Sequence, residues 1–202
     1  MSKKKEKIDK INIITLGNSS VGKTSLIQRY VDEIFEDTFA TIGFNTKFKN
    51  KILSNGEKLK VFFYDTSGQE KYNSLSFNYI KNCHGILLMY DISNKKSFIK
   101  IKDWLNNIFE HKDKDFPILL LGNKCDLEEK REVTKEEGDQ LAKELKLNFY
   151  ETSNKDNINI EKAITELIEM IYKKLGKEFE GFETDQVKLE KSKNIKKGKK
   201  RC

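Results

Sequence analysis

The sequence predicts an α/β fold in which helices cover both faces of one mostly parallel sheet. Short apolar runs alternate along the chain with stretches of helical periodicity. Several of these runs are almost continuously apolar, which is typical of strands buried on both faces. One pair of runs flanks Ser54-Asn55-Gly56, and an Asn-Gly pair favours a hairpin. We therefore expect six strands, with one antiparallel pair at an edge of the sheet.

The apolar runs place the strands and the periodic stretches place the helices. Strands are expected at residues 11–16, 44–53, 59–64, 85–90, 117–121 and 148–150. Helices are expected at residues 23–31, 75–81, 97–111, 134–146 and 158–175. Thr134 and Glu137 have the spacing of a capping box at the start of the fourth helix.

Charge is distributed unevenly along the 202 residues, whose net charge is +7. Residues 186–202 hold eight Lys or Arg and one Glu, and residues 1–10 hold five Lys and two acids, which leaves −3 for residues 11–185. We therefore predict a basic N-terminal extension at 1–9, one domain at 10–175, and a flexible basic tail at 176–202. The acidic body disfavours nucleic acid as a partner.

The remaining composition excludes several other classes. No apolar stretch reaches the length of a membrane span, and the N-terminus has no secretion signal. Cys83, Cys125 and Cys202 form no disulfide framework, which favours a reducing, cytoplasmic setting. We interpret Cys83 and Cys125 as packed thiols, and His84 and His111 as structural residues.

The first functional motif is GNSSVGKT at residues 17–24, which fits the phosphate-binding pattern G-x-x-x-x-G-K-[ST]. It lies between a predicted strand and a predicted helix, whose N-terminus favours phosphate. Lys23 is assigned to the β- and γ-phosphates, and the Thr24 hydroxyl to Mg²⁺. The loop residues predicted to contact the nucleotide are Ser19, Ser20, Val21, Gly22, Lys23, Thr24 and Ser25.

The second motif, DTSGQ at residues 65–69, follows the third apolar run. Asp65 ends a strand, where α/β sheets bind their ligands, and its carboxylate could hold Mg²⁺ through water. The N–H group of Gly68 could approach the γ-phosphate, and Gln69 could orient the attacking water. Taken alone, the motif could equally be an ordinary Asp-Gly turn.

The third and fourth motifs, NKCD at 123–126 and ETSNK at 151–155, point to guanine. The Asp126 carboxylate can accept hydrogen bonds from two adjacent guanine donors that adenine lacks, and unpaired buried groups reject the wrong base. Asn123 offers an amide, while Lys124 is expected to pack over the base and brace the phosphate loop. The backbone of Ser153, Asn154 and Lys155 is expected to meet guanine O6.

Together the four motifs and their spacing resemble the Ras superfamily of small GTPases, over residues 9–175, and most closely its Rab branch. Further likenesses are TIG at 41–43, YDTSGQE at 64–70 and GNKCD at 122–126. The resemblance implies a P-loop NTPase domain that binds GTP or GDP with Mg²⁺ and hydrolyses GTP as a monomeric switch in vesicle trafficking. It also implies that Thr41 senses Mg²⁺ and the γ-phosphate, and that Phe35 lies against guanine.

Several residues depart from the family pattern. Ser67 replaces an alanine beside the γ-phosphate, and Asn154 replaces an alanine whose backbone alone should matter. The aromatic triad of partner recognition is altered to Thr46, Tyr64 and Tyr79. The alternatives are a GTP-binding scaffold with little hydrolysis, another Ras-superfamily branch, or an ATP-using P-loop enzyme. NKCD and ETSNK argue against the last.

The tail and the switch segments suggest partners. The basic tail ends in Cys202, which resembles a prenylated Rab terminus, and one lipid chain with a basic patch anchors a protein to anionic membrane. Neither switch segment, 33–46 or 65–80, contains arginine, so hydrolysis should be slow without an activating protein. The expected partners also include an exchange factor, a dissociation inhibitor or escort protein, effectors, and the cytosolic face of an intracellular membrane, with endoplasmic reticulum or Golgi favoured.

Overall fold

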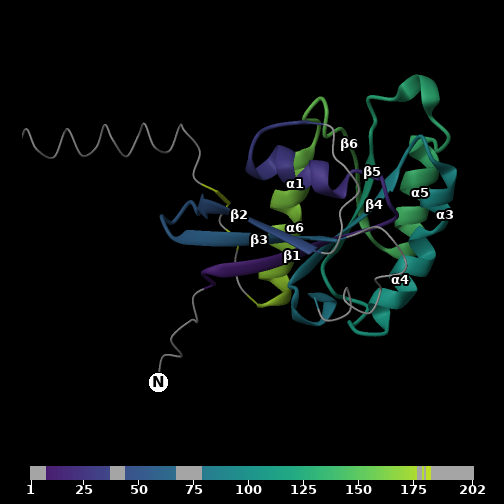
Figure 1. Ribbon diagram of the computed structural model, residues 1–202. Helices are drawn as coiled ribbons and strands as arrows, with labels where there is room; N and C mark the ends of the chain where they lie inside the picture. Colours follow the sequence, from purple (N-terminus) through teal and green to yellow (C-terminus); the bar gives the residue numbers. More distant parts are fainter. Residues whose placement is uncertain (1–7, 37–43, 67–78, 177–178, 180, 183–202) are drawn as a thin grey trace, which may run out of the picture.

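The computed structural model describes residues 8–36, 44–66, 79–176, 179 and 181–182, and it contains one six-stranded sheet (Figure 1). The strand order is β2-β3-β1-β4-β5-β6. Their bounds are β1 Lys10–Leu16, β2 Phe44–Ile52, β3 Lys58–Thr66, β4 Gly85–Asp91, β5 Ile118–Asn123 and β6 Asn148–Thr152. All six expected strands are confirmed, with ends shifted by one or two residues.

Strand directions also agree with the prediction. β1 pairs in parallel with β3 and β4, and β5 pairs in parallel with β4 and β6. Among the six strands that the structure describes, β2 alone runs antiparallel, against β3, with Phe48 opposite Phe62. The hairpin between them closes through a 2.8 Å hydrogen bond from the N–H of Gly56 to the carbonyl of Leu53. Gly56 has φ of 86°, a left-handed conformation that glycine adopts at little cost.

Helices cover both faces of the sheet (Figure 1). Their bounds are α1 Lys23–Val31, α3 Lys95–Ile99, α4 Ile101–Phe109, α5 Lys135–Leu145 and α6 Ile160–Lys174. α1 and α6 bury residues such as Leu26 and Leu167 against one face, while α4 and α5 bury Trp104 and Leu141 against the other. These two apolar layers account for the nearly continuous burial of the central strands β4 and β5.

Two predicted helices differ from the structure. The helix expected at 97–111 starts at Lys95, because the Asn94 side chain accepts hydrogen bonds from the N–H groups of Lys96 and Ser97, and it is divided at Lys100 into α3 and α4. The helix expected at 158–175 starts at Ile160, because Ile158 instead pairs with Ser153 in an antiparallel bridge. The helix expected at 75–81 is described only from residue 79, and residues 79–82 are helical.

The capping box at the start of α5 is confirmed. The N–H of Glu137 donates to the Thr134 hydroxyl at 3.1 Å, and the N–H of Thr134 donates to the Glu137 carboxylate at 2.8 Å.

Among the described helices, none has the length and apolar character needed to cross a membrane.

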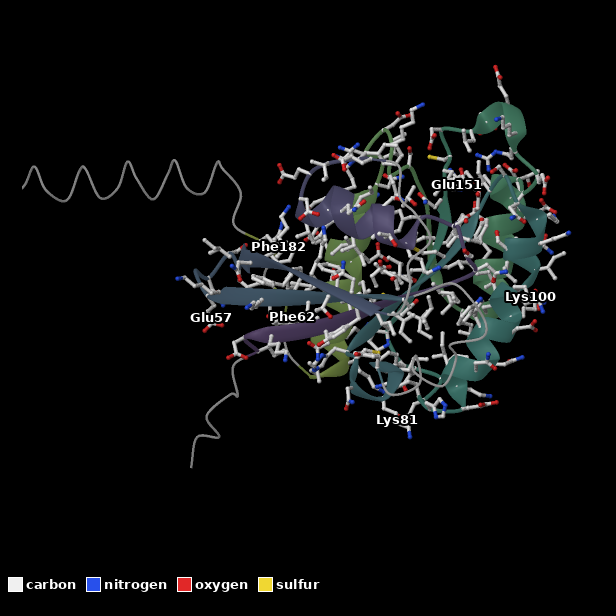
Figure 2. All side chains as sticks on the ribbon, viewed as in Figure 1. Glu57, Phe62, Lys81, Lys100, Glu151 and Phe182 are labelled. Atoms are coloured by element: carbon white, nitrogen blue, oxygen red, sulfur yellow. The ribbon has the colours of Figure 1, made fainter. Side chains whose placement is uncertain are left out.

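The chain continues to pack against the domain after α6. Phe182 forms an antiparallel bridge with Leu53, and the N–H of Ser54 donates to the carbonyl of Gly181 at 2.9 Å. Phe179 and Phe182 stack edge to face with ring centroids 5.2 Å apart, and both pack against the core. Figure 2 places Phe182 beside the β2–β3 hairpin. The predicted boundary at 175 therefore leaves out residues that belong to the packed domain.

Candidate functional site

The loop between β1 and α1 is built around two glycines with left-handed backbones. Gly17 has φ of 138° and Gly22 has φ of 98°. A Cβ at Gly17 would lie 2.2 Å from the carbonyl oxygen of Met89, and a Cβ at Gly22 would lie 2.3 Å from the Asn123 amide nitrogen. Both the backbone conformation and the surrounding space therefore require glycine.

This loop has the chemistry of an anion site. Within the described residues, the backbone N–H groups of Ser20, Gly22 and Lys23 donate to no protein acceptor. The Lys23 side chain is 5% exposed and its Nζ donates to the carbonyls of Gly17 at 2.9 Å and Asn18 at 2.7 Å. Burial lowers the pKa of Lys23 to about 8, with Asp65 opposing the shift. A phosphate chain would supply the acceptors and the negative charge that this loop needs.

Two oxygen-bearing side chains meet beside the loop. The Thr24 hydroxyl at the start of α1 donates to the Asp65 carboxylate at the end of β3, with an oxygen–oxygen distance of 2.7 Å. Asp65 is 4% exposed, and the next residue, Thr66, is fixed by a 2.7 Å hydrogen bond to the carbonyl of Thr15. A hydroxyl and a carboxylate are hard oxygen ligands, so this pair fits Mg²⁺ together with phosphate oxygens and water.

A cavity of about 390 Å³ adjoins the loop at the ends of β5 and β6. Its lining residues are Ser20, Gly22, Ser25, Phe35, Glu36, Asn123, Lys124, Asp126, Leu127, Asn154 and Lys155. The structure thus brings together the predicted residues of the first, third and fourth motifs. Ser19 lies in the same loop but is exposed and does not line the cavity.

The cavity presents acceptors and donors to a base. The Asp126 carboxylate is oriented by the Ser153 hydroxyl, which donates to its Oδ1 at 2.6 Å. The backbone N–H groups of Asn154 and Lys155 donate to no acceptor among the described residues. A carboxylate on one side and two N–H groups on the other complement the N1–H, N2 amine and O6 of guanine, whereas adenine offers the opposite pattern.

Asn123 connects the cavity to the loop between β1 and α1. It is completely buried, and its amide donates to the carbonyl of Val21 at 2.8 Å. Thr152 donates to its Oδ1 at 3.2 Å. Lys124 instead pairs with Asp91 at 2.6 Å, so the expectation that Lys124 braces the phosphate loop is not what the contacts show. Asn123 braces the loop instead, because its buried amide reaches the carbonyl of Val21.

Two further contacts were missed by the sequence reasoning. The Asn154 side chain donates to the carbonyl of Gly22 at 2.8 Å, so its side chain is engaged as well as its backbone. Arg29 of α1 donates to the carbonyls of Asn154 at 2.7 Å and Lys155 at 3.0 Å. The signal for Asn154 was the amide itself, since an amide in place of a methyl group can reach a backbone carbonyl.

Phe35 lies at the rim of the cavity and keeps 41% of its surface exposed. The Arg29 guanidinium lies 5.7 Å from the centre of its ring. An apolar ring that lines a cavity and remains half open can be covered by a planar base.

Arg131 links the two loops that line the cavity. Its guanidinium binds the Glu151 carboxylate in a bidentate manner, at 2.6 and 3.1 Å, and it also pairs with Glu128. The hydrogen bonds that Arg131 donates to the carboxylates of Glu128 and Glu151 raise its pKa. The segment that follows Asp126 is therefore fixed to the strand that precedes Ser153.

Cys83, Cys125 and His84 lie in surroundings typical of structural residues. Burial raises the pKa of the Cys83 thiol to about 12, and burial also raises that of Cys125. Burial lowers the pKa of His84, whose Nδ1 accepts the backbone N–H of Asn12 at 3.0 Å. Thr41, Ser67, Gly68, Gln69 and Cys202, which the motifs also single out, lie outside the described residues.

Comparison with known proteins gives consistent matches. A sequence model of the Ras family matches residues 12–173. The chain is 47% identical over 163 residues to Ras-related protein Rab-10 of Diplobatis ommata, a match that covers 80% of this chain and 81% of the relative. It is 41% identical over 170 residues to Ras-related protein Rab-8A of Bos taurus, covering 84% of this chain and 82% of the relative. The matched region contains the whole cavity.

Proposed function

This chain belongs to the Ras family of small GTPases, and from that premise we propose that its cavity binds the guanine of GTP and GDP while the loop at 17–24 binds the phosphates. It is a Rab-type GTPase that regulates vesicle trafficking. The single observation that supports the base assignment best is the Asp126 carboxylate, held by Ser153 in the cavity that Asn154 and Lys155 also line.

The residues at the phosphate end are suited to neutralise the negative charge of the phosphates. Lys23 is buried beside the N–H groups of the loop, with its Nζ held by the carbonyls of Gly17 and Asn18, and in such a low-dielectric site each hydrogen bond to a phosphate oxygen is strong. Thr24 and Asp65 would hold Mg²⁺, together with Thr41. Mg²⁺, when bound, neutralises the charge that develops on the phosphate oxygens. The site's own residues hold and orient the phosphate chain.

Hydrolysis by this chain alone is expected to be slow. We propose that Gln69 orients the attacking water and that Gly68 and Thr41 contact the γ-phosphate, which orders the two switch segments. Because residues 33–46 and 65–80 contain no arginine, these segments supply no guanidinium to stabilise the charge of the transition state. An activating protein would supply that arginine.

The ends of the chain support membrane recruitment. The basic tail with Cys202 fits a prenylated anchor on the cytosolic face of an intracellular membrane, aided by a dissociation inhibitor or escort protein. An exchange factor and effectors would bind through the switch segments. In this arrangement residues 1–9 are an extension, the domain runs from 10 to at least Phe182, and the remaining residues form the tether.

Calorimetry and single-turnover kinetics test the proposal. The purified chain with Mg²⁺ should bind GTP and GDP and should reject ATP by a factor of about 10⁴ or more. Single-turnover hydrolysis without a partner should proceed at about 10⁻⁴ to 10⁻³ s⁻¹. Equal affinity for GTP and ATP would contradict the base assignment, and a rate above about 1 s⁻¹ without a partner would contradict the need for an external arginine.

A further inference from the structure

The turn at residues 153–156 is held against the phosphate loop from two directions. On one side, the Asn154 amide donates to the carbonyl of Gly22, and Asn154 is 4% exposed. On the other side, Arg29 of α1 donates to the carbonyls of Asn154 and Lys155. The peptide groups that offer N–H donors to the base are therefore attached to the element that holds the phosphates.

Gly22 is the point where this attachment meets the phosphate loop. Its carbonyl also accepts the first hydrogen bond of α1, from the N–H of Leu26 at 2.9 Å. The neighbouring carbonyl, that of Val21, accepts the Asn123 amide at 2.8 Å. Two amide side chains from two different base-binding loops thus bind two consecutive carbonyls of the phosphate loop.

We propose that Asn154 is a positioning residue that slows nucleotide release by coupling the base-binding turn to the phosphate loop. This inference rests on the proposed guanine site. While the coupling is intact, the turn cannot move away from the base unless the phosphate loop moves away from the phosphates as well. The base and the phosphates must then dissociate in one event. Without the amide, only Arg29 among the described residues ties the turn to α1, so the turn moves away from the base more readily while the phosphates remain bound, which opens an additional route for release.

The contact is better suited to this role than to stabilising the fold. The Asn154 Oδ1 atom is buried and has no hydrogen-bond partner among the described residues. An amide that gains one hydrogen bond while burying an unpaired acceptor adds little net free energy to folding. Its effect is therefore expected in the rate of nucleotide release.

The first test measures release of fluorescent GDP into excess unlabelled GDP with Mg²⁺ present. Asn154→Ala should release GDP roughly fivefold to tenfold faster than wild type, which corresponds to the loss of one hydrogen bond. Alanine is the residue that the family resemblance places at this position, so the variant is expected to fold. Asn154→Asp keeps the shape but places a carboxylate against a carbonyl, and it should release GDP faster still.

A second measurement separates positioning from general loosening. Asn154 acts through the N–H groups that face guanine O6, so its effect should depend on that oxygen. In 6-thioguanosine diphosphate a sulfur atom, a poorer acceptor, replaces O6. Wild type should release this analogue faster than GDP, whereas Asn154→Ala should show a smaller difference between the two ligands. The Asn106→Ala variant, which makes the same chemical change on the exposed surface of α4, should match wild type throughout.

The outcomes distinguish the inference from the function on which it rests. If Asn154→Ala still prefers guanine and releases GDP within twofold of wild type, or more slowly, the coupling is refuted while the proposed function stands. If both ligands are accelerated equally by the alanine variant, Asn154 loosens the site without acting through O6, and the inference also fails. If wild type does not prefer GDP over ADP, both the function and the inference fail.

Discussion

The base end and the phosphate end of the nucleotide site are built in different ways. At the base end, side chains bind one another and the backbone in fixed pairs: Ser153 with Asp126, Thr152 with Asn123, and Asn154 with Gly22. At the phosphate end, the side chains expected to bind the ligand make local contacts. The Nζ of Lys23 donates to a carbonyl of its own loop, and the Thr24 hydroxyl donates to Asp65. The base end is preorganised through pairs that join separate loops, whereas the phosphate end gathers a buried ammonium group, a hydroxyl and a carboxylate that still have donor and acceptor positions for a phosphate and its cation.

This contrast assigns different tasks to the two ends. Fixed groups discriminate well, because a wrong base leaves them unpaired. The charged groups of the phosphate end set how strongly any phosphate chain is held, because their charge acts on the phosphates and not on the base. We therefore expect changes at the base end to alter which nucleotide binds, and changes at the phosphate end to alter how tightly and at what pH any nucleotide binds.

The largest effect is expected from Asp126→Ala at the base end. Removal of the carboxylate leaves the two adjacent guanine donors without an acceptor, so most of the preference for GTP over ATP, about 10⁴ in wild type, should be lost. Competition binding against labelled GDP measures this preference. Asp113→Ala, on an exposed loop, is the matched control and should retain it. A variant that still rejects ATP as strongly as wild type would show that the fixed pairs around Asp126 are not the discriminator.

The next effect is expected from Lys23→Met at the phosphate end. Loss of a buried ammonium group should weaken GTP and ATP alike, by roughly 100- to 1000-fold for GTP, because truncating one partner of a buried charge pair costs about 2–5 kcal/mol. The ligand-free protein should be no less stable, because the folded chain buries this cation at a cost. Calorimetry measures the affinity for the nucleotides, and urea unfolding measures the stability of the ligand-free protein, with Lys114→Met as control. A loss of stability that matches the loss of affinity would contradict the contrast.

The pH dependence of binding should come from the phosphate end alone. The pKa of Lys23 is lowered to about 8 in the ligand-free protein, and a bound phosphate favours the protonated form. GTP affinity should therefore be flat below about pH 8 and fall by up to tenfold per pH unit above it, with uptake of up to one proton. Titrations in buffers of different ionisation enthalpy count that proton, and Lys23→Met should take up none.

The same shift predicts how stability changes with pH. Between about pH 8 and pH 10.5 the unfolded chain keeps a proton on Lys23 that the folded, ligand-free chain has released. The contribution of this residue to the free energy of unfolding should therefore rise with pH across that window. A fall in stability that disappears in Lys23→Met would contradict this sign.

The smallest effect is expected from Phe35→Ala at the rim of the base end. The ring is 41% exposed and lies near one cation, so its loss should weaken GDP and GTP by about fivefold without changing the preference for guanine. Equilibrium titration with both nucleotides measures this. Phe48→Ala removes a similarly exposed ring from β2, far from the cavity, and should bind like wild type.

Much of this site could be predicted from the sequence because each motif follows an apolar run. Parallel strands end at one edge of a sheet, so motifs placed after such runs converge there. Local chemistry that depends on neighbours in space could not be predicted. The Asn94 side chain caps α3 by accepting the N–H groups of Lys96 and Ser97, and the hydrogen bond of Asn154 requires Gly22 to lie within reach. Packing of Phe182 on Leu53 joins residues far apart in the chain.

The contact between Phe182 and Leu53 shortens the segment that would link the domain to a membrane. If the chain left the domain at Leu175, the 27 residues to Cys202 could extend at most about 95 Å. Leaving from Phe182 beside the hairpin, the 20 remaining residues can extend at most about 70 Å, whatever their conformation. The aromatic pair thus moves the point of departure to the β2 edge, and if Cys202 carries the proposed lipid anchor, it limits the distance between the nucleotide site and the bilayer.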